Sequence, residues 1–257
     1  MLVRRFSTAV VCAAVVLAAC GSSSKSPARG TLSGTLLVSA AASLNKAFTQ
    51  IGKDFEVAHP GTTVRFNFDA SSALVTQITS GAPADVFASA DATNMDKLST
   101  AKLLRGAPQN FARNQLEIAT KPSNPKHIKG LTDLASVGVI ALCAEEVPCG
   151  KYAAQVLDQA KVSIPESSIT RGQNATTTLG MVSQGDANAA IVYVTDVKGA
   201  GNAVAGIGIP ANENAIATYP IAALKDASNT ALAQAFVDYV LSTAGQHTLQ
   251  SFAFMAP

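Results

Sequence analysis

The sequence predicts an α/β fold in which a parallel or mixed sheet is covered by helices. Short apolar strand patterns alternate with segments of helical periodicity along most of the 257 residues. The chain contains no tryptophan, only 5% aromatic residues and 48% hydrophobic residues. Such a composition favours small side chains packed between a sheet and its helices.

In the first half of the chain, each expected strand is followed by a helix. The expected strands are residues 35–39, 64–68 and 85–89. After the first, apolar residues recur at helical spacing from Ser43 to the turn at Pro60. A short helix is expected around residues 74–78, and Asp91 opens a third because its carboxylate suits an N-cap.

The same alternation continues in the second half. The expected strands are residues 115–120, 137–142, 189–194 and 218–224. Helices are expected to open at Gly150 and after Asn174, and Gly185 suits the end of the second one. Residues 231–241 carry the clearest amphipathic helix pattern of the chain.

The first residues have the pattern of a cleaved lipoprotein signal. Two arginines precede an apolar run at residues 9–17, which is too short to span a bilayer. Leu-Ala-Ala stands directly before Cys20 and resembles a bacterial lipobox. We therefore expect removal of residues 1–19, lipidation of Cys20 and a flexible Ser/Gly/Pro-rich tether over residues 20–34. An ordinary signal cleaved nearby is the alternative. Either way the protein is expected outside the cytoplasm, and the lipid would anchor it to the cell membrane.

Charge argues against nucleic acid as a partner. Without residues 1–19, Lys plus Arg falls from 19 to 17 and equals the 17 acidic residues. A neutral body with few basic clusters lacks the electrostatic footprint of a nucleic-acid-binding protein. The remaining length suits one large domain, or two of about 120 residues each.

Only two cysteines remain when Cys12 leaves with the signal and Cys20 carries the lipid. These are Cys143 and Cys149, six residues apart. Outside the cell, such a pair most often forms a disulfide. A metal site is the alternative, although two thiols without a nearby histidine make a poor ligand set. The three histidines are scattered and are interpreted as surface residues: His59, His127 and His247.

Two stretches repeat an apolar strand, small residues and a serine that opens a helix. The serines are Ser43 in the first and Ser71 with Ser72 in the second. Hydroxyls and unpaired N–H groups at a helix N-terminus suit an anion, and no Lys or Arg stands beside these serines. Three further candidates at strand ends are Cys149, Ala175 and Tyr193. Singly, each has a simpler structural explanation, such as a helix cap, a turn, or a core tyrosine with a satisfied hydroxyl.

Five motifs together resemble the molybdate-binding proteins of ABC importers. They are AAASL at 40–44, ASSAL at 70–74, GAPADVFASAD at 81–91, VPCGKY at 147–152 and IVY at 191–193. The resemblance runs from about Thr35 to the C-terminus, and the segment from Gly81 is its most specific part.

The resemblance implies a type II periplasmic-binding-protein fold. Such a fold has two α/β lobes, each a mixed sheet with covering helices, joined by two crossing strands with the ligand cleft between them. The implied parts are residues 35–113 and 218–257 for the first lobe and 114–217 for the second. It further implies a monomer that binds molybdate, and tungstate as well, passes it to a permease, uses no cofactor and catalyses no reaction.

The family's ligand set is carried over residue by residue. Two serines of the family donate through hydroxyl and backbone N–H, and they correspond to Ser43 and Ser71 here. A match shifted by one position would select Ser72 in place of Ser71. Backbone N–H donors fall on Cys149 and Ala175. The tyrosine hydroxyl falls on Tyr193.

Two residues depart from the family pattern. Cys149 stands where alanine is usual. It would either form a disulfide with Cys143 that fixes the binding loop or face the ligand as a free thiol. Asp69 stands where a small neutral residue is usual, and we expect it to point away from a bound dianion.

Two other functions are weighed against molybdate binding. The same fold could bind another oxyanion such as sulfate or phosphate. An extracytoplasmic serine hydrolase is the other candidate, but the sequence has no Gly-x-Ser-x-Gly elbow and no histidine placed as a base.

Overall fold

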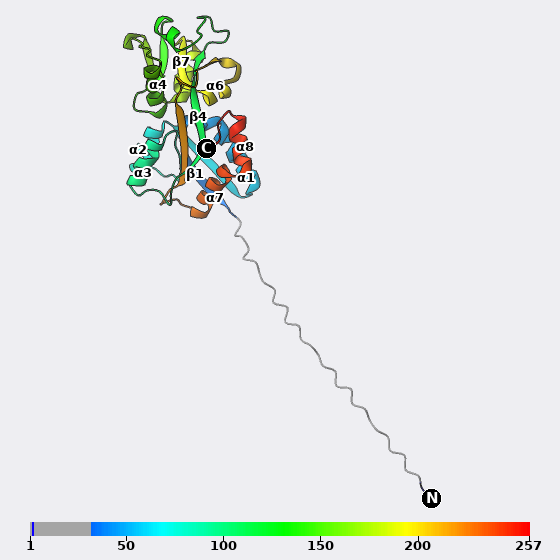
Figure 1. The fold of residues 1–257 in the computed structure, drawn as a ribbon. Helices are drawn as coiled ribbons and strands as arrows, with labels where there is room; N and C mark the ends of the chain where they lie inside the picture. The colour runs from blue at the N-terminus through cyan, green and yellow to red at the C-terminus, as the bar shows by residue number, and fades with distance from the viewer. Residues whose placement is uncertain (1, 3–31) are drawn as a thin grey trace. The chain divides into compact units, whose positions relative to one another are not determined.

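The computed structural model describes residues 2 and 32–257 of the chain (Figure 1). The expected signal segment, the lipidation site Cys20 and residues 20–31 of the expected tether lie outside the described residues. None of the helices in the described part is both long and apolar enough to cross a membrane.

The first lobe begins with three parallel strands. They are β1 (Gly34–Ala41), β2 (Thr62–Asp69) and β3 (Val86–Ala88). β1 lies between the other two, with Val38 opposite both Phe66 and Val86. Five helices belong to this lobe: α1 (Asn45–Ala58), α2 (Ser71–Thr79), α3 (Ala92–Thr100), α7 (Thr230–Leu241) and α8 (Thr243–Ser251).

Aromatic side chains fill the core of this lobe. Phe55 of α1 meets Phe236 of α7 edge-to-face at 5.3 Å, and Phe48 lies 6.1 Å from the same ring. All three are fully buried. Because each such side chain contributes about 1.5–3 kcal/mol on burial, these contacts hold the C-terminal helices to the start of the chain.

Two long strands connect the lobes (Figure 1). They are β4 (Gln109–Thr120) and β9 (Ile216–Ala223). The first half of β4 pairs antiparallel with β9, and residues 116–120 pair with β7 and β8 of the second lobe. The sheet therefore runs continuously in the order β2-β1-β3-β9-β4-β7-β5-β6, with β8 on β4.

The second lobe is formed by one uninterrupted stretch of chain. Its other strands are β5 (Ile140–Cys143), β6 (Ile169–Gly172), β7 (Ala189–Tyr193) and β8 (Ala205–Gly208). Its α-helices are α4 (Pro148–Gln159), α5 (Ala175–Gln184) and α6 (Val194–Ala200). Short 3₁₀ turns complete the elements of both lobes: Ala42–Leu44, Leu131–Ser136, Glu166–Ser168 and Gly201–Ala203.

Several element ends differ from the sequence-based expectation. Ser43 does not open α1, because it lies in the preceding 3₁₀ turn, and its side chain caps no helix. The strand expected from residue 137 begins at Ile140, since Gly138 takes a positive φ that turns the backbone. The helix expected from Gly150 begins at Pro148, which suits the first helical position. The predicted lobe boundaries at 113/114 and 217/218 fall inside β4 and β9.

Candidate anion-binding site

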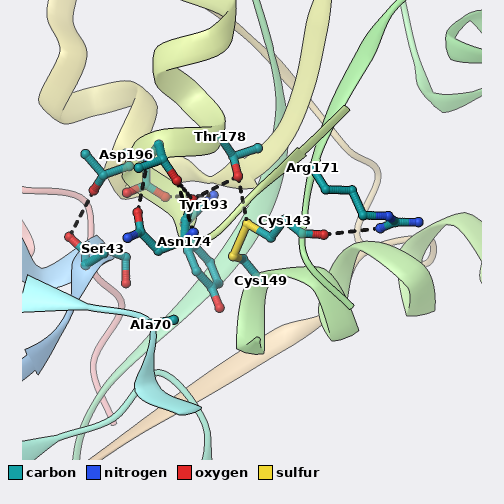
Figure 2. Close-up of a disulfide and its surroundings, with 12 residues drawn as sticks. Ser43, Ala70, Cys143, Cys149, Arg171, Asn174, Thr178, Tyr193 and Asp196 are labelled. Carbon is teal, nitrogen blue, oxygen red and sulfur yellow. Dashed lines mark hydrogen bonds between the residues drawn. A yellow bond between two sulfur atoms is a disulfide. The ribbon is translucent and has the colours of Figure 1, made fainter. Parts of the chain in front are cut away.

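A small cavity lies between the two lobes. The five predicted site residues all line it: Ser43, Ser71, Cys149, Ala175 and Tyr193. Figure 2 shows the phenol of Tyr193 reaching down between Ser43 and Cys149 toward Ala70. Residues from both lobes therefore face one space, as a clamp around a small ligand requires.

Three helices begin at this cavity. α2 starts with Ser71, α4 has Cys149 as its second residue, and α5 starts with Ala175. The N–H groups of a first helical turn have no acceptor within the helix, and the helix dipole adds positive potential there. The cavity is therefore suited to an anion, which these three groups can contact through the backbone.

The hydroxyl of Ser71 is oriented by the chain around it. Its Oγ accepts a hydrogen bond from the backbone N–H of Ala90 at 3.0 Å, and the residue is buried. Its proton thus remains available to a ligand. Ser72, the one-place alternative, does not line this cavity and faces a neighbouring hollow instead.

Tyr193 has a buried hydroxyl without a partner. The residue is 1% exposed, and among the described residues its OH is the one buried side-chain polar atom that lacks a hydrogen bond. Burial raises its pKa well above the usual value, so the phenol stays neutral and keeps its proton. The alternative of a core tyrosine with a satisfied hydroxyl is therefore wrong. A buried polar atom normally has a partner, so this one indicates a ligand.

The sequence matches the family of bacterial extracellular solute-binding proteins over residues 36–254. The chain belongs to this family. It is 40% identical to the molybdate-binding protein ModA of Mycobacterium tuberculosis, and the match covers 98% of both chains.

Two solved structures share the fold of this solute-binding protein. The periplasmic molybdate-binding protein of Azotobacter vinelandii has a TM-score of 0.78 at 21% identity and covers 86% of this chain and 99% of its own. The sulfate-binding protein SubI of Mycobacterium tuberculosis has a TM-score of 0.76 at 16% identity and covers 86% of each chain. At these identities the likeness concerns the fold, in agreement with the expected two-lobe architecture.

A disulfide fixes the loop that carries one backbone donor. Cys143 at the end of β5 is bonded to Cys149 in the first turn of α4, with Cα atoms 5.8 Å apart. Neither cysteine is therefore a free thiol or a metal ligand. Gly150 is needed beside it, because a Cβ there would lie 2.0 Å from the carbonyl oxygen of Ala144.

Asp69 lines the cavity, so the expectation that it points away is wrong. Its Oδ1 accepts hydrogen bonds from the N–H of Ala70 at 2.7 Å and from Nδ2 of Asn174 at 3.1 Å. These two donors hold the carboxylate at the start of α2, where Ala70 has no side chain that could cap the helix. Asn174 belongs to the other lobe, so this contact joins the two lobes beside the cavity.

Sequence reasoning missed the side chain that contacts Ser43. The Oγ of Ser43 lies 2.9 Å from the hydroxyl of Tyr219, which is buried on β9. Tyr219 falls within an expected strand, but nothing in the local pattern indicates which atom its hydroxyl would meet.

The lining of the cavity differs from that expected of a serine hydrolase. Within the described part of the chain, no histidine, lysine or arginine lines it. His127 and His247 are exposed, whereas His59 is half-buried against Phe55, so its assignment to the surface is only partly right. Neither Ser43 nor Ser71 has a histidine partner of the kind that activates a nucleophilic serine among the residues that line this cavity.

Proposed function

We propose that this solute-binding protein captures molybdate, with tungstate as a second ligand, and delivers it to an ABC permease. The observation that carries the proposal is the unpartnered hydroxyl of Tyr193, buried where three helix N-termini meet. The 40% identical ModA, which matches over 98% of both chains, supports molybdate as the ligand.

The chemistry of the ion suits the donors of the cavity. A tetrahedral dianion offers only acceptor oxygens, and its burial is costly unless each oxygen receives hydrogen bonds. The hydroxyls of Ser43, Ser71 and Tyr193 and the backbone N–H groups of Cys149 and Ala175 supply donors from both lobes. With no cationic side chain in the lining, release needs only separation of the lobes.

Sulfate is the nearest competitor, because it shares the charge and the tetrahedral shape. Discrimination between the two ions would rest on cavity size. Singly protonated phosphate is a second candidate because Asp69 lines the cavity and places an acceptor there for a ligand proton.

The location and state of the protein are part of the same proposal. Lipidation of Cys20 after the Leu-Ala-Ala sequence would hold a monomeric receptor at the outer face of the cell membrane. Intact mass measurement of the mature protein would detect the lipid, and light scattering would give its oligomeric state.

A thermal-shift and calorimetry panel tests the ligand. Molybdate and tungstate should stabilise the protein strongly, sulfate and phosphate weakly or not at all. Ser71→Ala should weaken molybdate binding about tenfold or more, since a hydrogen bond to a charged group contributes about 1.5–3 kcal/mol. Ser72→Ala is the matched control and should bind like the wild type. The absence of any response to molybdate and tungstate would overturn the proposal.

A further inference from the structure

A chain of buried polar side chains runs from the crossing strands to Ser43. Nδ2 of Asn114 on β4 donates to the hydroxyl of Tyr219 at 3.3 Å and to Oγ1 of Thr195 at 2.8 Å. The Tyr219 hydroxyl lies 2.9 Å from Oγ of Ser43. All four residues are buried.

One backbone contact determines which groups donate and which accept along these hydrogen bonds. The N–H of Gln115 donates to Oδ1 of Asn114 at 3.0 Å, so the amide must present its NH₂ group to Tyr219. Tyr219 therefore accepts from Asn114. Its single proton has one acceptor within reach in the described residues, which is Oγ of Ser43.

The direction decides what Ser43 can offer to a ligand. Because Ser43 accepts a hydrogen bond from the Tyr219 hydroxyl, its own O–H is not used inside the protein and can donate into the cavity. In the reverse direction, Ser43 would donate to Tyr219 and turn only lone pairs toward an anion. An oxyanion without protons can only accept hydrogen bonds, so it binds Ser43 only when the serine is free to donate.

We infer that Asn114 and Tyr219 are positioning residues that hold Ser43 as a hydrogen-bond donor to the bound oxyanion. The inference rests on the proposed function and goes one step beyond it, to residues that do not line the cavity. Asn114 and Tyr219 lie on β4 and β9, so the strands that connect the lobes also set the polarity of the first-lobe donor.

A double-mutant cycle on Ser43 and Tyr219 tests this inference with molybdate as the probe. Ser43→Ala and Tyr219→Phe should each lower the affinity about tenfold, because each removes the donated hydrogen bond or its orientation. The double variant should bind no more weakly than Ser43→Ala alone, since Tyr219 acts through Ser43. Tyr219→Phe keeps the ring that packs on Phe111 and Phe254, and Tyr239→Phe on α7 is the matched control with wild-type affinity.

Two results would overturn the inference: wild-type affinity in Tyr219→Phe, or losses that multiply in the double variant. The proposed function would still stand in both cases, provided the wild type binds molybdate. A wild type that binds no molybdate would overturn both. If Tyr219→Phe fails to fold, Asn114→Leu provides a second cycle, because it removes the amide that orients the Tyr219 hydroxyl and adds no charge. Its loss of affinity should disappear in the Ser43→Ala background, and a loss that persists there contradicts the inference.

Discussion

Asn174 donates a hydrogen bond from Nδ2 to Oδ1 of Asp69 at 3.1 Å, from the second lobe to the first. The other end of the same amide accepts from the N–H of Thr177 at 3.0 Å and caps α5. One side chain thus fixes the start of a helix whose first N–H faces the cavity, and also holds a carboxylate of the opposite lobe beside that cavity.

Neutralising Asp69 should strengthen the binding of a dianion. Asp69→Asn keeps an oxygen for the two donors but removes a negative charge from the lining. Repulsion between like charges that are close together is on the order of 1–3 kcal/mol in a partly screened site, so molybdate affinity should rise at least fivefold. Calorimetry at low and high salt measures the change.

Asp69→Ala is the comparison, because it removes the charge and the lobe-to-lobe hydrogen bond together. Weaker molybdate binding by Asp69→Asn would contradict the expectation, and weaker phosphate binding would favour the phosphate alternative.

Tyr193→Phe should change stability and binding in opposite directions. The ligand-free protein should be as stable as the wild type or slightly more so, because the change removes a buried hydroxyl without a partner. Molybdate affinity should fall about tenfold or more, since the ligand loses a donor. Melting curves with and without molybdate give both quantities. A variant that is less stable without ligand would show that the hydroxyl has a partner inside the protein.

Opening the disulfide should weaken both the fold and the site. A loop closed between Cys143 and Cys149 contributes about 2 kcal/mol by restricting the unfolded chain. The double variant Cys143→Ser, Cys149→Ser should therefore melt at a lower temperature. It should also bind molybdate more weakly, because the N–H of residue 149 is less well ordered. The wild type in reductant should approach this behaviour, and reductant should leave the double variant unchanged. Equal molybdate affinity in all samples would show that the disulfide is not needed to order the binding loop.

Two half-buried carboxyl groups of the second lobe, Asp196 and Glu117, should make stability depend on pH. Burial raises the pKa of Asp196 to about 7, opposed by a hydrogen bond from the N–H of Tyr193 and assisted by nearby Glu117. Burial likewise raises the pKa of Glu117 to about 7. In the unfolded chain both groups ionise near pH 4. Between about pH 4 and pH 7 the folded protein therefore holds more protons than the unfolded chain. The free energy of unfolding should consequently decrease as pH rises through this interval and level off above it.

Urea unfolding at several pH values between 4 and 8 measures this dependence. Glu117→Gln should flatten the profile relative to the wild type, because the variant has no proton to lose at this position. Asp238→Gln on the exposed side of α7 provides a comparison in which an acidic group outside this pair is removed. A Glu117→Gln profile that runs parallel to the wild type would contradict the assignment.

Much of the fold could be predicted from the sequence because local patterns determine it. Asp91 and Asn174 cap α3 and α5 as expected, and Gly185 ends α5 in a left-handed conformation. β6 and β8 were missed. The segment Ile-Thr-Arg-Gly of β6 is half-buried and barely alternates, and β8 is a short strand rich in glycine. Their strand pairing is determined by neighbours distant in the sequence rather than by local pattern.

The candidate site was likewise predictable only in part. Strand ends indicated the regions of the five predicted residues, and the resemblance to molybdate-binding proteins selected the individual residues. The contacts of Asp69 with Asn174 and of Tyr219 with Ser43 span 105 and 176 residues. Such side-chain pairs depend on how the lobes meet and on the register of β9, neither of which a single sequence displays.

The crossing of the chain from one lobe to the other and back imposes an order on folding. The second lobe is one continuous stretch, so it can assemble before the C-terminal return segment has been synthesised. In the first lobe, one edge of β3 stays unpaired until β9 has been synthesised. The aromatic core around Phe55 is likewise incomplete until Phe236 on α7 is present. Contacts of such long separation form late, so a chain emerging from the ribosome would keep its first lobe unfinished until nearly the last residue. The first lobe therefore becomes complete only when the last two helices have been synthesised, although it begins with the first strand of the described residues.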